Sequence, residues 1–329
     1  MLRDASRRPG SNAIRPSEPA VQLSRYRRMA LKDKVKTALD ETRLLILGSQ
    51  ILFGFQLNGM FQDAFEQISA VGRELNACGY FLMASTVGLL IAPSMQHRLV
   101  ERGQDTQRLH RATSVFAALA LIPFAPSLGI TFYIVLERHT GAPLAAAAGA
   151  AFAALALFFW FGIERMIKQP ERKMDDDQDE GKTPLHTRIE QMLTESRVML
   201  PGAQAILGFQ FAVMLTKAFD QLPPSAQAVH VAALALVALA VILLMTPAAI
   251  HRITFAGEDS ERFHALGTRF IVAAAVPLGL GISLELFVAL VRATQSPALG
   301  IAGAGVTAAL FAGLWFVQPL ILRARRAGG

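Results

Sequence analysis

Apolar residues in this chain are grouped into eight long runs, which clusters of polar and charged residues separate. The first half holds the runs at approximately 44–62, 77–97, 113–136 and 143–163, and the second half holds those at approximately 198–216, 228–250, 268–291 and 298–321. A helix needs roughly 20 predominantly apolar residues to cross a bilayer. The pattern therefore predicts an all-α fold, an integral membrane bundle of eight transmembrane helices.

The two halves of the chain are copies of one four-helix unit. The chain matches itself at an offset of 154 residues, the separation of Glu41 and Glu195. ETRLLILGSQILFGFQ, which begins at Glu41, recurs as ESRVMLPGAQAILGFQ, and AFEQ at Ala64 recurs as AFDQ at Ala218. Identical residues also recur, without a gap, at Pro93, His97, Arg98, Gly103, Asp105, Arg108 and His110. These matches indicate a tandem duplication.

The basic residues predict how the helices are oriented. With eight spans and the N-terminus inside, the inner segments hold 28 of the 32 Lys and Arg residues. The outer loops hold the other four, which are Arg73, Arg138, Lys217 and Arg292. Cytoplasmic segments are enriched in Lys and Arg, so both termini are predicted to be cytoplasmic. Four spans per copy give both copies the same orientation, and we expect parallel repeats related by a pseudo-two-fold axis along the membrane normal.

The remaining segments are polar. Residues 1–28 are rich in Arg, Ser and Pro and are predicted to be a disordered basic tail. The first repeat covers 29–165, an acidic cytoplasmic linker covers 166–184, the second repeat covers 185–322, and a basic C-terminal tail covers 323–329.

Each repeat opens with an amphipathic stretch, at 31–42 and again at 185–196. Each stretch is either a helix that lies on the inner membrane face or a cytoplasmic extension of the first span. The sequence leaves both interpretations open.

Composition agrees with a membrane location and narrows the choice of partners. Hydrophobic residues make up 53% of the chain and charged residues 17%, against roughly 25% charged residues in soluble proteins. We assign the net charge of +7 to contact between the inner face and anionic headgroups of the bilayer. No nucleic-acid-binding motif accompanies it, so nucleic acid is not expected as a partner. A protein partner or a homo-oligomer is compatible with the sequence.

Polar residues inside the apolar runs are candidates for function. They are Gln50, Gln56, Gln204, Gln210 and Glu285. The four Gln residues either line a solute path between the copies or form hydrogen bonds between helices. Residues six apart lie about 120° apart on a helix, so the two Gln of one copy do not both face one narrow path. Glu285, whose counterpart is Thr131, is either a functional carboxylate at membrane depth or a partner for Arg292.

A second candidate set lies where the second span of each copy ends and in the loop that follows. It comprises His97, Arg98, Arg108 and His110, with their counterparts His251, Arg252, Arg262 and His264. The functional interpretation is a pair of inner-face sites that bind an anionic headgroup or ligand. The alternative is ordinary anchoring of a helix end by basic residues. No metal-binding spacing is found, and the one cysteine, Cys78, excludes a Cys-based cluster.

The ExRxxxxGxQ motif, the AP/TP-x-x-x-HR motif and the Arg-rich loop after it resemble those of a bacterial family of integral membrane proteins of unknown function. Members of that family typically carry one four-span unit, and this chain resembles two units in tandem. The resemblance covers about residues 40–165 and 194–322. It implies a bacterial inner-membrane location but no activity, catalytic residue or cofactor.

Three functional hypotheses remain. The first is a non-enzymatic membrane scaffold or interaction module that meets partners through its basic inner face. The alternative is a transporter or channel for a small solute or ion, with a path between the two repeats. An enzyme ranks last, because no nucleophile–base pair, phosphate-binding glycine loop or two-metal carboxylate set is found.

Overall fold

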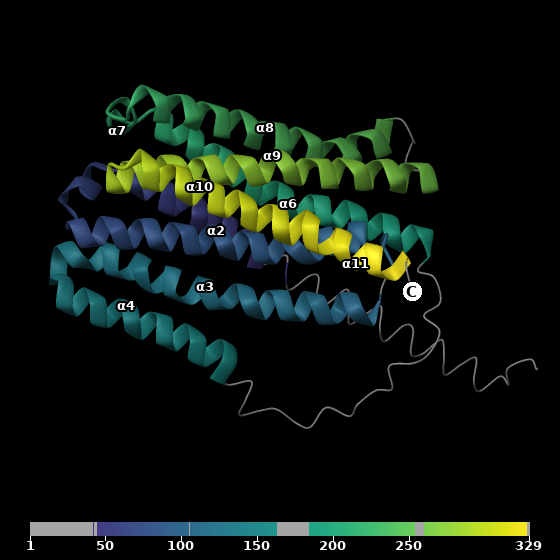
Figure 1. The fold of residues 1–329 in the computed structure, drawn as a ribbon, viewed down its shortest axis with the longest axis horizontal. Coiled ribbons are helices and arrows are strands. Elements are labelled where there is room, and N and C mark those ends of the chain that lie inside the picture. Colours follow the sequence, from purple (N-terminus) through teal and green to yellow (C-terminus); the bar gives the residue numbers. More distant parts are fainter. Residues whose placement is uncertain (1–41, 43–44, 105, 163–183, 254–259, 328–329) are drawn as a thin grey trace, which may run out of the picture.

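The computed structural model describes residues 42, 45–104, 106–162, 184–253 and 260–327, and within these residues the fold is all-helical. The first copy contains a helix over Leu45–Met60, η1 (Asp63–Gln67), α2 (Ala70–Leu99), α3 (Gln107–Thr140), α4 (Ala142–Leu157) and the π-helical turn η2 (Phe158–Gly162). The second contains α6 (Leu185–Met214), α7 (Lys217–Asp220), α8 (Pro224–Ile253), α9 (Glu261–Thr294), α10 (Pro297–Ala312), the π-helical turn η3 (Gly313–Val317) and α11 (Gln318–Ala327). The long helices run side by side along one direction (Figure 1).

Six of the helical segments are long and apolar enough to cross a membrane. They cover Ala70–Leu99, Gln107–Glu137, Ala142–Phe161, Pro224–His251, Glu261–Thr294 and Pro297–Arg325. These segments contain the six more strongly apolar runs of the sequence. The chain is therefore an all-helical protein with six candidate membrane-spanning helices.

The other two predicted spans, 44–62 and 198–216, are less apolar. The first is the shorter helix Leu45–Met60, and the second is the C-terminal part of α6. Glutamine side chains lower the hydropathy of both segments. An arrangement with eight spans therefore stays a prediction.

The stretch 185–196 is continuous with the first span of the second copy, because α6 is a single helix of 30 residues. In this copy the amphipathic stretch and the predicted span thus form one continuous helix. Its counterpart at 31–41, the predicted tail 1–28 and most of the linker, 166–183, lie outside the described residues. The predicted C-terminal tail 323–329 is helical through Ala327.

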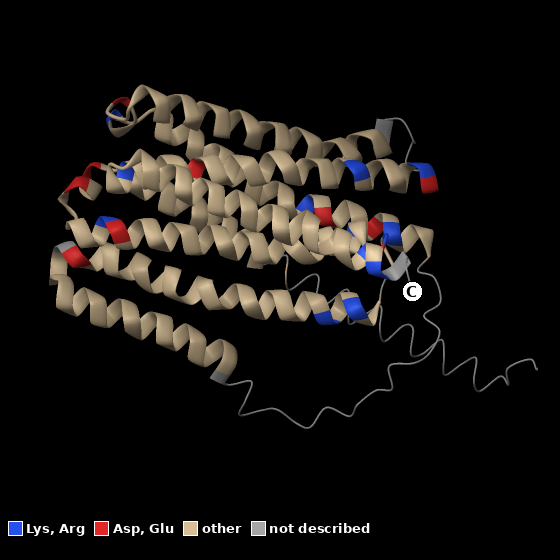
Figure 2. Ribbon diagram, in the orientation of Figure 1, with Lys and Arg blue, Asp and Glu red and all other residues tan. Residues whose placement is uncertain are grey.

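The helices of the two copies begin at matching positions. α2 begins at Ala70 and α8 at Pro224, and α3 begins at Gln107 and α9 at Glu261, each pair separated by the offset of 154 residues. Figure 1 shows α2 and α8 starting at the same end of the bundle, and Figure 2 shows most described Lys and Arg residues at the opposite end. Matching sequence thus forms matching helices that run in the same direction.

The copies meet through their first helices, where the equivalent rings of Phe55 and Phe209 lie 4.5 Å apart, and through unlike long helices. α9 and the α10–η3 segment of the second copy pack on α2 of the first copy, while α8 packs on α9 and α3 on α2. A two-fold axis would also bring α3 against α8, and in the described part of the chain that pair makes at most a marginal contact. The described long helices therefore do not repeat their contacts as a two-fold axis would require, and the pseudo-two-fold stays a prediction.

A glycine on α2, Gly88, lets aromatic side chains of the second copy pack closely against this helix. The ring of Phe311 fills the space that a Cβ at Gly88 would occupy, and the Trp315 indole donates a 2.8 Å hydrogen bond to the Gly88 carbonyl. The counterpart of Gly88 on α8 is Ile242, which is 61% exposed. Because a branched side chain replaces the glycine, α8 cannot accept aromatic rings in the same way.

Candidate functional sites

One buried polar centre lies inside the second copy. Gln210 on α6 donates a 2.8 Å hydrogen bond from Nε2 to Glu285 Oε2 on α9. His230 on α8 contacts the same two residues. Its Nδ1 lies 2.9 Å from Glu285 Oε1, and its Nε2 lies 3.0 Å from the backbone carbonyl oxygen of Gln210. All three side chains are fully buried. Three helices thus converge on one carboxyl group.

The geometry of this centre fixes its protons. The backbone carbonyl of Gln210 can only accept a hydrogen bond, so His230 Nε2 must carry a proton and donate it. One further proton lies between His230 Nδ1 and Glu285, as imidazolium with carboxylate or as imidazole with carboxylic acid. Both forms have no net charge, which suits a site deep in an apolar bundle. The pair can therefore hold a proton that moves between its members.

The first copy places neutral residues at the same positions. Gln56, the counterpart of Gln210, donates from Nε2 to Ser127 Oγ at 3.0 Å and to Thr131 Oγ1 at 2.9 Å. Thr131 is the counterpart of Glu285, and the buried Asn76 is the counterpart of His230. The polar site is therefore present in both copies but contains ionisable residues in only one.

The predicted polar set does not line one path. Gln56 and Gln210 bond within their own copies, and Gln50 is buried against Gly202 of the other copy. Gln204 lies on the exposed surface. Glu285 does not pair with Arg292, which instead bonds Glu66 at 3.1 Å. Gln56 and Gln210 thus form hydrogen bonds between helices, as the second of the two hypotheses for the Gln residues predicts.

Sequence reasoning missed His230, which lies near the start of its apolar run. It also missed Tyr80 of the first copy, a fully buried residue of α2 that stacks on Phe53 at 4.2 Å and lies within electrostatic reach of Glu285. A signal for His230 was available. Polar residues stand at matching positions, Asn76 and His230, in otherwise apolar helices.

A second buried polar centre, the inner-end clamp, joins the copies at the basic end. Glu195 of α6 lies 2.6 Å from His97 Nδ1 and accepts a 2.5 Å hydrogen bond from Arg98 Nε, both on the last turn of α2. Burial alone would raise the pKa of Glu195, but the neighbouring Arg98 and His97 lower it to about 2. A carboxylate of one copy thus binds the His-Arg motif of the other.

Arg98 retains unused hydrogen-bond donors within this clamp. Its Nη1 and Nη2 atoms, and Nε2 of His97, are buried without a partner among the described residues. Glu195 therefore occupies only the inner edge of the guanidinium group.

Next to the clamp, Arg188 ties α6 to α9. It bonds Glu261 at 2.9 Å and the Arg102 carbonyl at 3.3 Å, and its Nη2 donates to His264 Nδ1 at 3.2 Å. His264 Nε2 faces Gly103, whose φ of 80° is the left-handed conformation that glycine favours. A Cβ at Gly103 would lie 2.9 Å from that nitrogen.

The structure thus gathers three of the eight predicted inner-face residues, His97, Arg98 and His264, around the same junction. Arg108 and Arg262 are exposed, and His110 is half-buried. His251 is also half-buried and stacks on Phe263 at 4.5 Å. The side chain of Arg252 lies outside the described residues.

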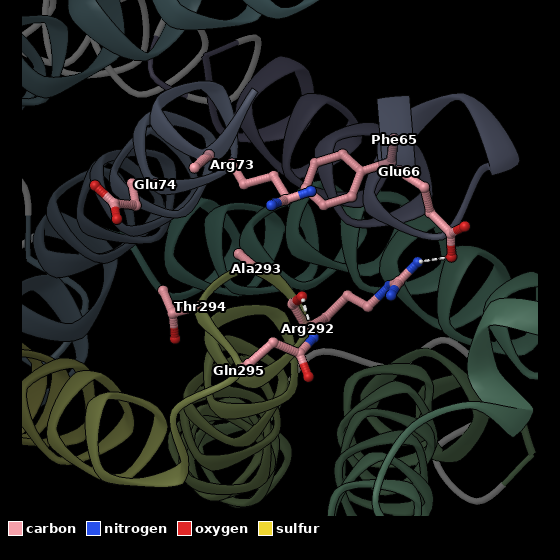
Figure 3. Close-up of a pocket in the computed structure, with 9 residues that line it drawn as sticks. Phe65, Glu66, Arg73, Glu74, Arg292, Ala293, Thr294 and Gln295 are labelled. Atoms are coloured by element: carbon pink, nitrogen blue, oxygen red, sulfur yellow. Dashed lines mark hydrogen bonds and ion pairs between the residues drawn. The ribbon is translucent and has the colours of Figure 1, made fainter. Parts of the chain in front are cut away.

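A cavity opens between the two copies at the opposite end of the bundle, which the sequence predicts to be the outer end (Figure 3). Arg73 and Glu74 of α2, Glu66 of η1 and Arg292 of α9 contribute its charged lining. Its volume is about 390 Å³. The recurring AFEQ stretch contains Glu66, but no motif paired Glu66 with Arg292, because the two lie 226 positions apart in the chain.

The described residues contain no group of three or more His, Cys, Asp or Glu side chains that could hold a metal ion. Six apolar helices, charged residues at the two ends and paired polar side chains within the bundle define a multi-pass helical membrane protein. The chain belongs to the family of unknown function DUF6328, which matches residues 27–164 and again residues 180–319. The two matches agree with a tandem duplicate of one domain. No curated protein and no solved structure matches the chain.

Proposed function

We propose that the chain is a non-enzymatic scaffold or interaction module of the bacterial cytoplasmic membrane, with both termini in the cytoplasm. In this proposal its eight spans form a packed support, and the basic inner end binds anionic lipid headgroups and presents a surface to a protein partner or to a second copy. The proposal assigns no catalytic residue and no cofactor.

One observation carries this proposal. Several buried polar side chains form hydrogen bonds between helices, either within a copy, as Gln56 and Gln210 do, or between copies, as Glu195 and Arg98 do. Side chains that hold helices together in this way act as internal bonds of a bundle. A solute path would instead need polar atoms that face a common water-filled space.

The basic inner end supports lipid contact. Its exposed arginines come from the α2–α3 loop, from the first turns of α3 and α9 and from α11, and they are Arg102, Arg108, Arg111, Arg262, Arg323 and Arg325. A Lys or Arg near an anionic membrane surface contributes roughly 1 kcal/mol of attraction. Several arginines at one end therefore favour phosphatidylglycerol-type lipids over zwitterionic ones.

The lipid preference is testable on the full chain in mixed bilayers. Replacing Arg108 and Arg262 together by Gln is expected to lower the preference for phosphatidylglycerol over phosphatidylcholine by about tenfold or more. Lipid retained through native mass spectrometry measures it. The control replaces Lys217, at the opposite end and outside the cavity described below, and should leave the preference unchanged. An equal loss in both variants would contradict inner-face binding.

Transport is the second candidate function, and the centre at Glu285 is the observation that favours it. An ionisable pair buried at membrane depth is a common element of proton-coupled pathways. Its neutral counterpart in the first copy shows that the fold tolerates a site without it. In a transporter the pair would have to exchange its proton with water on both sides of the membrane.

A further inference from the structure

The outer cavity lies where two copies meet and where the membrane-crossing helices end. η1 and the first turn of α2 form one wall, and the last turn of α9 forms the other. Its volume of about 390 Å³ is within the range of roughly 300–1,000 Å³ that small-molecule sites occupy. The cavity is thus large enough for a small polar molecule at headgroup level.

Arg292 is the better-buried cation of this cavity. Its side chain is only 11% exposed, and its Nη2 bonds Glu66 Oε1 at 3.1 Å. Its Nε atom is buried and has no partner in the described part of the chain. A guanidinium group with an unused inner donor is poised to bind an oxyanion.

Arg73 faces the same cavity from α2 (Figure 3). Its one hydrogen bond in the described residues is long, 3.4 Å from Nη1 to the Ile68 carbonyl. Most of its five donors are therefore left for a ligand. The two guanidinium groups come from different copies, so a bound oxyanion would bridge the copies.

The carboxylates of the lining decide the class of ligand. Glu66 and Glu74 are exposed and line the cavity together with the two arginines, so the four formal charges cancel. A simple anion would meet repulsion from both carboxylates, and a simple cation from both guanidinium groups. A molecule that carries both charges can pair each of them.

We propose that the outer cavity binds a small zwitterion in which an oxyanion and a primary ammonium group are a few bonds apart. The oxyanion lies between Arg73 and Arg292, and the ammonium group lies against Glu66, whose carboxylate is next to Arg292 (Figure 3). A phosphoethanolamine group has this chemistry, either as the headgroup of a membrane lipid or as a free solute. This site is separate from the inner face and does not depend on the function proposed above.

The second copy does not repeat the site, which makes the assignment specific. Gln227 is the counterpart of Arg73, and its Nε2 donates to the carbonyls of Phe219, Asp220 and Leu222 in its own loop. That side chain therefore closes a turn and leaves no cationic group to bind a ligand. The contact between the two copies therefore forms one such cavity, between η1 and α2 of the first copy and α9 of the second.

The test measures binding of O-phosphoethanolamine to the full chain in detergent by titration calorimetry, and retention of phosphatidylethanolamine by native mass spectrometry. Arg73→Gln and Arg292→Gln are each expected to weaken binding at least tenfold, and Glu66→Gln severalfold. Lys217→Gln removes an outer-end cation beyond the cavity and should change nothing. Thermal unfolding of each variant verifies that the fold is kept.

Binding of the free compound, lost in both arginine variants, would identify a soluble zwitterion as ligand. Retention of the lipid alone, with the same losses, would identify the lipid headgroup. If neither probe binds, or if inorganic phosphate binds as tightly as phosphoethanolamine, the proposal is wrong.

Discussion

Replacing Glu195 by Gln is expected to lower the free energy of unfolding by about 3 to 5 kcal/mol. The reason lies in the inner-end clamp, where Glu195 is the carboxylate that neutralises the buried Arg98. Without it, a guanidinium group remains buried with no counter-charge among its bonded neighbours. Unfolding in mixed micelles, followed by intrinsic fluorescence, measures the change.

Two controls separate charge burial from loss of the helix contact. Replacing both Glu195 and Arg98 by apolar residues of similar size should restore most of the lost stability, because no buried charge is left. Removing the ion pair of Arg188 and Glu261 should cost only about 0 to 1 kcal/mol, since Glu261 is 66% exposed. Full stability of the Glu195→Gln protein would show that the clamp does not join the copies.

The clamp also predicts sensitivity to acid. The pKa of Glu195 is lowered from 4.5 to about 2 in the folded chain, so its contribution is complete above pH 4.5. The contribution is lost as the pH falls from about 4.5 to 2, where the carboxylate is protonated. The Glu195→Gln protein should lack this part of the acid destabilisation.

The second large effect is expected at Glu285. Replacing it by Leu leaves Gln210 Nε2 and His230 Nδ1 buried without partners and should cost about 2 to 4 kcal/mol. Replacement by Gln should cost far less. The new amide oxygen accepts from Gln210, its NH2 group donates to His230 Nδ1, and His230 Nε2 still donates to the Gln210 carbonyl.

The first copy supplies a matched control for this pair of variants. Thr131→Val removes one of the two acceptors of Gln56 and leaves Ser127, so the expected cost is about 1 kcal/mol or less. Unfolding measurements in the same micelles compare the three proteins. If Glu285→Gln is as damaging as Glu285→Leu, the ionised pair itself is required, and the case for proton-coupled transport strengthens.

Much of the fold was predictable because it follows from local pattern. Six of the eight apolar runs correspond to long apolar helices, and the self-match at 154 residues predicts matching helix starts such as Gln107 and Glu261. A continuous apolar run predicts a helix of membrane length whatever the packing of that helix against other helices. The end of the bundle with most described Lys and Arg also agrees with the predicted basic face.

The arrangement of the copies was not predictable in this way. It depends on single differences between the copies, such as Gly88 against Ile242, which decide where aromatic rings of the partner can enter. The hydrophobic pattern does not distinguish Gly88 from Ile242, because both residues are compatible with an apolar helix. For this reason the packing of α9 on α2 is not repeated by α3 on α8 in the described part of the chain.

The candidate sites were predicted in part, for a related reason. Gln210, Glu285, His97 and Arg98 stood out as polar residues in apolar surroundings. Their partners did not, because His230 lies near the start of α8 and Glu195 lies in the charged amphipathic stretch of α6, where polar residues are common. The outer cavity brings together segments that only the tertiary contact between the copies makes neighbours.

Water access to the polar centres tests the central claim most directly. Single cysteines would replace Gln56 and Gln210 in a chain whose exposed Cys78 is replaced by Ser, and a membrane-impermeant maleimide would be applied from each side. Cysteines at the exposed Arg108 and at Phe211, 60% exposed beside Gln210, serve as the water-facing and lipid-facing controls. A packed module predicts labelling at position 108 alone. Labelling at both 56 and 210 would reveal a water-filled path through the bundle and would contradict the account.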